Sequence, residues 1–142
     1  MDENMTSSEI VSDLVRIHQD RIEEYRQILH ESNSIELDIK TIFERIIEES
    51  TRYSQQLQEK IHPGSGEPGK IYKLWLSEKA PVADAGKKII LATCAADELV
   101  TNNTYSMAIS MITDEKIRRL LEDHQQGLKN LHAHIRQYYH AQ

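Results

Sequence analysis

The chain has 142 residues, the length of one domain with a single core. Its 23 acidic and 17 basic residues give a net charge of −6, and the basic residues form no run, which argues against binding to nucleic acid or to an anionic membrane surface. Cys94 is the single cysteine, so no intramolecular disulfide can form. Residues 1–8 do not resemble a signal peptide, and no apolar run approaches the roughly 20 residues that span a bilayer. We therefore expect a soluble, cytoplasmic protein.

The first helix is expected over residues 8–31. Only 5 glycines and 3 prolines interrupt the whole sequence, which favours long helices over a sheet. Ser8 is expected to cap the first turn, and apolar side chains then recur at steps of three or four, as on one face of an amphipathic helix. The polar residues 31–34 predict a short turn, so the second helix should lie antiparallel to the first.

The second helix is expected over residues 35–61 and is followed by a long connection. Two prolines and three glycines in residues 62–69 end it firmly. Residues 70–79 predict a short amphipathic helix with Trp75 on its apolar side, and residues 80–81 break the chain again. The 22 residues from His62 to Ala83 belong to neither long helix, a length that suits a crossover along the helices.

Two further long helices are expected over residues 84–112 and 114–139, with Asp114 in the cap between them. The predicted stripe of the last helix consists of Ile117, Leu120, His124, Leu128, Leu131, Ile135 and Tyr138. Residues 1–142 therefore predict one all-α domain, a four-helix bundle whose long connection carries a short helix.

Each long helix places a polar residue near the middle of its apolar stripe. These residues are His18, Glu49, Glu98 and His124. Antiparallel packing would bring the four to about the same level of the bundle. A carboxylate inside a bundle loses its hydration and must gain a hydrogen bond, an ion pair or a metal ion. The sequence thus predicts one polar layer at mid-height.

One interpretation of this layer is a metal site with iron, manganese or zinc. Dinuclear bundles use a Glu from each of two helices and Glu-x-x-His from each of the other two. That motif is absent, because Arg52 follows Glu49 by three residues. A mononuclear site formed by Glu49, Glu98 and His124, with His18 as a further ligand, stays open.

The interpretation that we prefer is a hydrogen-bonded network without any cofactor. Tyr25, Tyr53 and Tyr105 would donate to Glu49 and Glu98. Arg21 or a protonated histidine would supply the countercharge. A third reading has the stripes rotated, which would leave the acids in solvent.

Other candidate sites carry weaker signals. His132, His134 and His140 are interspersed with Tyr138 and Tyr139 in a tail that we expect to be solvated, because their spacing does not place the histidines on one helix face. Cys94 lies on an apolar stripe and is expected to pack as a small apolar residue. The sequence contains no Gly-rich phosphate loop, Gly-x-Ser-x-Gly elbow or Cys-x-x-Cys pair.

Residues dispersed over most of the chain resemble those of a known protein family. They lie in residues 20–25, 43–50, 94–105 around Glu98, and 132–135. With them the chain resembles the bacterial ferritin-like four-helix-bundle proteins of unknown function. The resemblance implies a ferritin-like fold and a bacterial source, without an established activity. Ferritin relatives store iron, oxidise it or detoxify peroxide, but this chain departs from their ligand set at both Glu-x-x-His positions.

The sequence therefore predicts a non-enzymatic ferritin-like bundle, with a stress-related role as one option, that acts by self-association or partner binding. A homodimer is expected to form through Val11, Val15 and Leu29, taken as leftover apolar positions. The alternative is a ferritin-like metal-binding protein or oxidoreductase with an altered, His-poor site. A third hypothesis is an apolar-ligand binder in which the Trp75 segment acts as a lid.

Overall fold

The computed structural model describes residues 6–31, 35–61, 67–79 and 86–141, and within these ranges the chain is all-α. The described elements are α1 (Ser7–Glu31), α2 (Leu37–Gln58), α3 (Lys70–Glu78), α4 (Lys87–Met111) and α5 (Glu115–Ala141). The predicted all-α class is confirmed. Across the described ranges, no helix combines the length and apolar character needed to cross a membrane.

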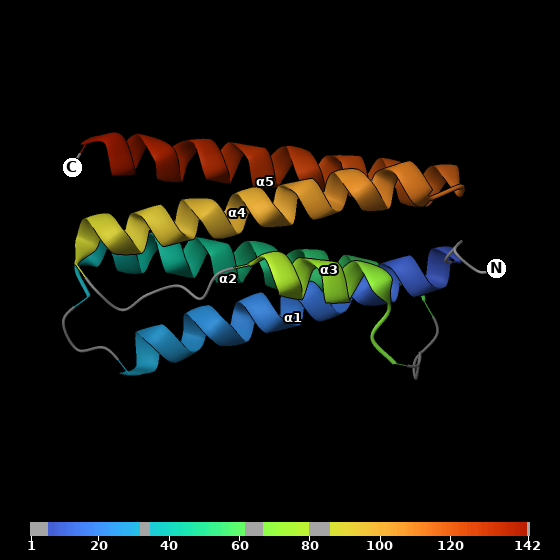
Figure 1. Ribbon diagram of the computed structural model, residues 1–142, viewed down its shortest axis with the longest axis horizontal. Coiled ribbons are helices and arrows are strands. Elements are labelled where there is room, and N and C mark those ends of the chain that lie inside the picture. Colours follow the sequence, from blue (N-terminus) through green and yellow to red (C-terminus); the bar gives the residue numbers. More distant parts are fainter. Residues whose placement is uncertain (1–5, 32–34, 62–66, 80–85, 142) are drawn as a thin grey trace.

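The four long helices run roughly along one axis (Figure 1). α1 packs antiparallel to α2, and α4 packs antiparallel to α5. α2 ends and α4 begins at opposite ends of the molecule, so the connection between them runs along its length. α3 lies in this connection and contacts both α1 and α4.

The helix ends differ from the expected ones by at most three residues where the structure describes them, and the end of α1 at Glu31 and the start of α3 at Lys70 agree with expectation. α2 is shorter than the expected residues 35–61. At its C-terminal end the Lys60 amide donates to the Leu57 carbonyl, three residues earlier, so the α-helical pattern of bonds stops there. α5 extends two residues past 139, to Ala141. Of the predicted breaks at residues 31–34, 62–69 and 80–81, the parts at 32–34, 62–66 and 80–81 lie outside the described residues, as does the expected helix start at residue 84.

Side-chain caps are present at the starts of α1, α3 and α5, the last from the expected Asp114. Thr6, rather than Ser8, caps α1: the Glu9 amide donates to Thr6 Oγ1 (3.1 Å), and the Thr6 amide donates to Glu9 Oε1 (2.8 Å). Asp13 of α1 caps α3, because its carboxylate accepts from the amides of Gly69 (2.8 Å) and Tyr72 (3.1 Å). The short helix is therefore anchored to α1 by a residue that the sequence did not single out.

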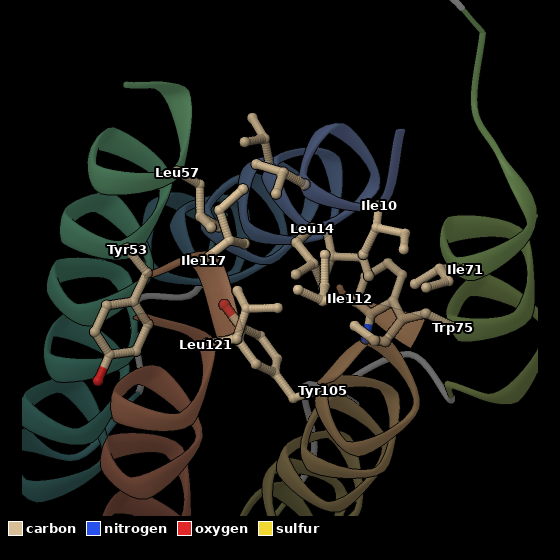
Figure 2. Packing of buried hydrophobic residues seen from close by; sticks show 14 of the residues in the cluster. Ile10, Leu14, Tyr53, Leu57, Ile71, Trp75, Tyr105, Ile112, Ile117 and Leu121 are labelled. Atoms are coloured by element: carbon tan, nitrogen blue, oxygen red, sulfur yellow. The ribbon is translucent and has the colours of Figure 1, made fainter. Parts of the chain in front are cut away.

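Two apolar clusters fill the space between the helices. The first contains Trp75 and Ile71 of α3 beside Ile10 of α1, and it extends to Leu121 of α5 next to Tyr105 (Figure 2). Trp75 is fully buried, and its indole N–H donates to Thr101 Oγ1 (3.1 Å). The second cluster gathers Tyr25, Ile39, Ile42, Phe43, Ile46, Ile90, Leu91, Cys94, Leu131 and Ile135 toward the other end.

Two predictions about apolar positions are wrong. Leu121, not Leu120, is fully buried on the inner stripe of α5. Val11 and Val15, which we expected to form a dimer surface, are buried in the first cluster. α1 packs against α2 and also against α3, so a wider face of α1 is covered than one stripe accounts for.

Candidate functional site

Buried polar side chains from all four long helices meet near mid-length of the molecule. They include His18 and Arg21 of α1, Ser50 of α2, Asp97 and Glu98 of α4, and His124 of α5. We call this group, with the Tyr25, Tyr53, Tyr105, Glu49 and Gln56 side chains bonded to it, the polar layer. Each of the four residues predicted from the sequence lies in or at the edge of it.

One series of hydrogen bonds joins the two buried histidines. His124 Nε2 lies 2.7 Å from the side-chain oxygen of Gln56, and His124 Nδ1 lies 3.0 Å from the Tyr105 hydroxyl. The same hydroxyl lies 2.7 Å from His18 Nε2. The imidazole ring centres are 6.5 Å apart, so Tyr105 bridges the two rings.

The series continues from His18 to a buried guanidinium. His18 Nδ1 lies 3.0 Å from Ser50 Oγ, and that oxygen accepts a hydrogen bond from Arg21 Nη1 (3.0 Å). All four nitrogens of the two imidazole rings are therefore engaged by protein groups. We call the full series, from Arg21 to Gln56, the hydrogen-bond chain.

Chemistry fixes the direction of every bond in this chain. The amide oxygen of Gln56 only accepts, so Nε2 of His124 must carry a hydrogen. Burial, with a smaller contribution from Arg52, lowers the pKa of His124 to about 4, so the ring is neutral at pH 7 and its Nδ1 accepts from the Tyr105 hydroxyl.

The same reasoning applies to the other half of the chain. The Tyr105 hydroxyl donates its hydrogen bond to His124, so its oxygen accepts one from Nε2 of His18. Burial, and then the charge of Arg21, lowers the pKa of His18 well below its usual value, so this ring is also neutral. Its Nδ1 accepts from the Ser50 hydroxyl, whose oxygen accepts from Arg21. Both histidines therefore carry their hydrogen on Nε2.

Arg21 also faces the buried acids of α4. Its Nη2 forms an ion pair with Glu98 Oε2, and its Nε lies 3.8 Å from Asp97 Oδ2. Tyr25 donates to the same Asp97 oxygen (2.8 Å) rather than to Glu49 or Glu98 as the sequence suggested. Burial raises the pKa of Asp97, while Arg21 and the hydrogen bond from Tyr25 oppose that rise.

Glu49 lies at the edge of the polar layer and not at its centre. It is half-buried, whereas the next residue, Ser50, is fully buried. The Tyr53 hydroxyl donates to Glu49 Oε2 (3.2 Å), and its ring stacks on His124 with the centres 3.9 Å apart. Burial raises the pKa of Glu49, although Arg21 and the Tyr53 hydrogen bond oppose the rise.

A glycine of α5 makes room for this pair. A Cβ added at Gly127 would collide with the Tyr53 hydroxyl and approach Glu49 Oε2 to 3.1 Å. We expect Gly127→Ala to lower the free energy of unfolding by about 1–2 kcal/mol, because overpacking outweighs the better helix propensity of alanine. Urea denaturation measures the change. The double variant Gly127→Ala with Tyr53→Phe should recover most of it, and an equal loss in both backgrounds would contradict this account.

The arrangement separates the four predicted ligands into two groups. His18 and His124 belong to the hydrogen-bond chain, whereas Glu98 pairs with Arg21 and Glu49 with Tyr53. Among the residues that the structure describes, no three His, Cys, Asp or Glu side chains are grouped so as to hold a metal ion.

The donor atoms fit a metal unequally. The unprotonated Nδ1 atoms of His18 and His124 already accept hydrogen bonds, so neither imidazole offers a free lone pair. The carboxylates differ: Glu49 Oε1, Asp97 Oδ1 and Glu98 Oε1 are buried and accept no hydrogen bond. Such oxygens suit a hard cation, whereas the imidazoles would first have to leave the hydrogen-bond chain.

The remaining candidates offer little reactivity. Cys94 is buried, with Sγ 3.7 Å from the Tyr25 hydroxyl, and burial raises the pKa of its thiol to about 12, so the thiolate is suppressed. In the C-terminal tail, the His134 ring meets Tyr138 edge-on at 5.3 Å. His132 and His134 are half-buried there, and His140 is exposed.

Sequence reasoning missed three members of the polar layer, Ser50, Asp97 and Gln56. Asp97 and Glu98 are consecutive, and both are buried because α4 is covered by α3 on one side and α5 on the other. Gln56 is seven residues after Glu49, a spacing of two helix turns that was available as a signal.

Comparison with protein-family models, curated proteins and solved structures finds no match.

Proposed function

We propose that this chain is a ferritin-like four-helix bundle that performs no enzymatic chemistry and acts by associating with itself or with another protein. Two antiparallel helix pairs joined by one long connection support the ferritin-like description. The order of the described helices, two long, one short and two long, agrees with it.

The observation that carries the proposal is the hydrogen-bond chain. It occupies the lone pairs of both imidazoles, so neither is free to bind a metal as the two histidines of a dinuclear bundle do. Its ends are the guanidinium of Arg21 and the amide of Gln56, neither of which exchanges a proton readily near pH 7. The chain therefore relays no proton and serves to specify one packing of the four helices.

Metal addition tests this proposal. Protein purified without a histidine tag and treated with chelator should melt at the same temperature with and without Mn²⁺, Zn²⁺ or, under anaerobic conditions, Fe²⁺. A ligand that binds only the folded state at 100 times its Kd would add about 2.7 kcal/mol of stability, which is readily seen. A rise in melting temperature that Glu98→Ala abolishes would contradict the proposal.

The orphaned carboxylate oxygens favour one alternative, a metal-binding protein or oxidoreductase that uses Glu49, Glu98, His124 and His18. Two acidic side chains, Asp97 and Glu98, face the single guanidinium of Arg21, so a cation would balance the charge. Binding would have to displace Arg21 from Glu98. The alternative therefore predicts that Arg21→Leu strengthens metal binding, whereas our proposal predicts no binding in either protein.

A further inference from the structure

The solvent face of α4 carries no charge after Lys88. From Ile89 to Met111 the only charged residues are Asp97 and Glu98, and both are buried. The outward positions recur at helical spacing and form what we call the α4 stripe: Ile89, Ala92, Ala96, Leu99, Asn103, Ser106, Met107 and Ser110. A helix face without charged residues can be covered by a neighbour without removing a charge from water.

The large apolar members of the α4 stripe are open to solvent. Ile89 is 53% exposed, Leu99 49% and Met107 38%. Beside them lies an open groove of about 450 Å³, in which Ala92, Ala96 and Leu99 of α4 face α5 residues that include Arg136 and Tyr139. An apolar strip with a polar rim of this kind marks a protein–protein interface.

We propose that a second copy of this chain covers the α4 stripe, with the two α4 helices antiparallel about a two-fold axis near Leu99. This inference rests on the self-association proposed above and names its surface. Reversing the helix about Leu99 sets Ala92 opposite Ser106, places Ala96 nearest to Asn103, and places Ile89 between Met107 and Ser110. The stripe is thus complementary to itself, and its small residues allow the backbones to approach closely.

Charge complementarity also favours the antiparallel order. Within one copy, Gln125 donates to Ser106 Oγ, so exposed Glu122, one turn earlier on α5, lies toward the C-terminal end of α4. Arg136 lies beside Ala92 at the other end, where Lys88 is also found. The two-fold axis brings Glu122 of one copy to the level of Arg136 of the second copy.

The area agrees with that of a stable dimer. A helix of 25 residues, the length of α4, is about 37 Å long. With α5 packed about 9 Å away and each helix about 10 Å wide, the joint face is about 19 Å wide and measures on the order of 700 Å². Specific interfaces bury about 800 Å² on each partner.

Sedimentation equilibrium of the full chain tests the interface. The wild type should be a dimer at micromolar concentration, and Leu99→Lys should raise the dimer Kd at least 100-fold while the circular dichroism spectrum stays unchanged. Glu122→Arg should weaken the dimer, and the double variant Glu122→Arg with Arg136→Glu should restore it. The control is Leu37→Lys, since Leu37 is 78% exposed on α2, outside this face; it should leave the Kd as it is.

The outcomes separate this inference from the proposed function. A wild type that stays monomeric at high micromolar concentration overturns both this dimer and homotypic association. A dimer that survives Leu99→Lys, or that Leu37→Lys disrupts, overturns the α4 interface and leaves self-association standing. If Leu99→Lys dissociates the dimer but the charge swap restores nothing, the antiparallel arrangement is overturned.

Discussion

Replacing Arg21 by leucine should lower the free energy of unfolding by about 3–5 kcal/mol, the usual cost of leaving a buried charge without its partner. Arg21 is fully buried, pairs with Glu98, lies 3.8 Å from Asp97 and donates to Ser50. Leucine fills part of the volume but neutralises neither acid. The hydrogen-bond chain would also lose its first donor. Urea denaturation followed by circular dichroism measures the loss.

Two further variants isolate the cause. Arg26→Leu, an exposed position on the same helix, should change the free energy of unfolding by no more than about 0.5 kcal/mol. The double variant Arg21→Leu with Glu98→Leu should recover part of the loss, because it removes the acid that lost its partner. A loss for Arg21→Leu no larger than that for Arg26→Leu would show that the ion pair does not hold the polar layer together.

Acid should destabilise the protein through its buried histidines. The folded-state pKa of His124 is about 4, against about 6.5 in an unfolded chain. Between these values the unfolded state binds more protons, so stability present above pH 6.5 is lost as the pH falls, at up to about 1.4 kcal/mol per pH unit. The loss from His124 reaches about 3 kcal/mol at pH 4. The pKa of His18 is also lowered well below its usual value, so His18 acts in the same direction.

A variant separates His124 from the acids, which act in the opposite direction. Burial raises the pKa of Asp97 and Glu49, so these groups favour the folded state as the pH falls through their own titration range. We expect the difference in unfolding free energy between the wild type and His124→Gln to shrink by about 3 kcal/mol as the pH is lowered from 7 to 4. His30→Gln, at an exposed position, should run parallel to the wild type. A constant difference between wild type and His124→Gln would contradict a buried neutral imidazole.

The long helices could be predicted from the sequence because their apolar residues recur with the helical period. Ile10, Leu14 and Ile17 lie on the predicted inner face of α1 and are fully buried. The breakers on either side of α3, together with Trp75, also predicted a short helix there, and α3 spans Lys70–Glu78. Local spacing and turn residues were sufficient for these features.

The sequence could not predict which side chains of the polar layer contact one another, because these contacts depend on how each helix is rotated about its axis relative to its neighbours. A rotation of α2 by one residue exchanges Glu49 at the centre for Ser50, and the structure places Ser50 there. Tyr25 reaches Asp97 rather than a glutamate for the same reason. Val11 and Val15 were expected on a dimer surface, because a single apolar stripe does not show how many neighbouring helices pack against α1.

The protonation of His18 and His124 tests the central claim most directly. Two-bond ¹⁵N–¹H correlation spectra of uniformly ¹⁵N-labelled protein at pH 7 distinguish the two neutral tautomers from the cation. We expect both rings to be neutral with hydrogen on Nε2 and an unprotonated Nδ1, and we expect these signals to stay unchanged when Zn²⁺ is added. A hydrogen on Nδ1 of either ring, a cationic ring, or a Nδ1 signal that moves with Zn²⁺ would contradict a polar layer closed by its own hydrogen bonds.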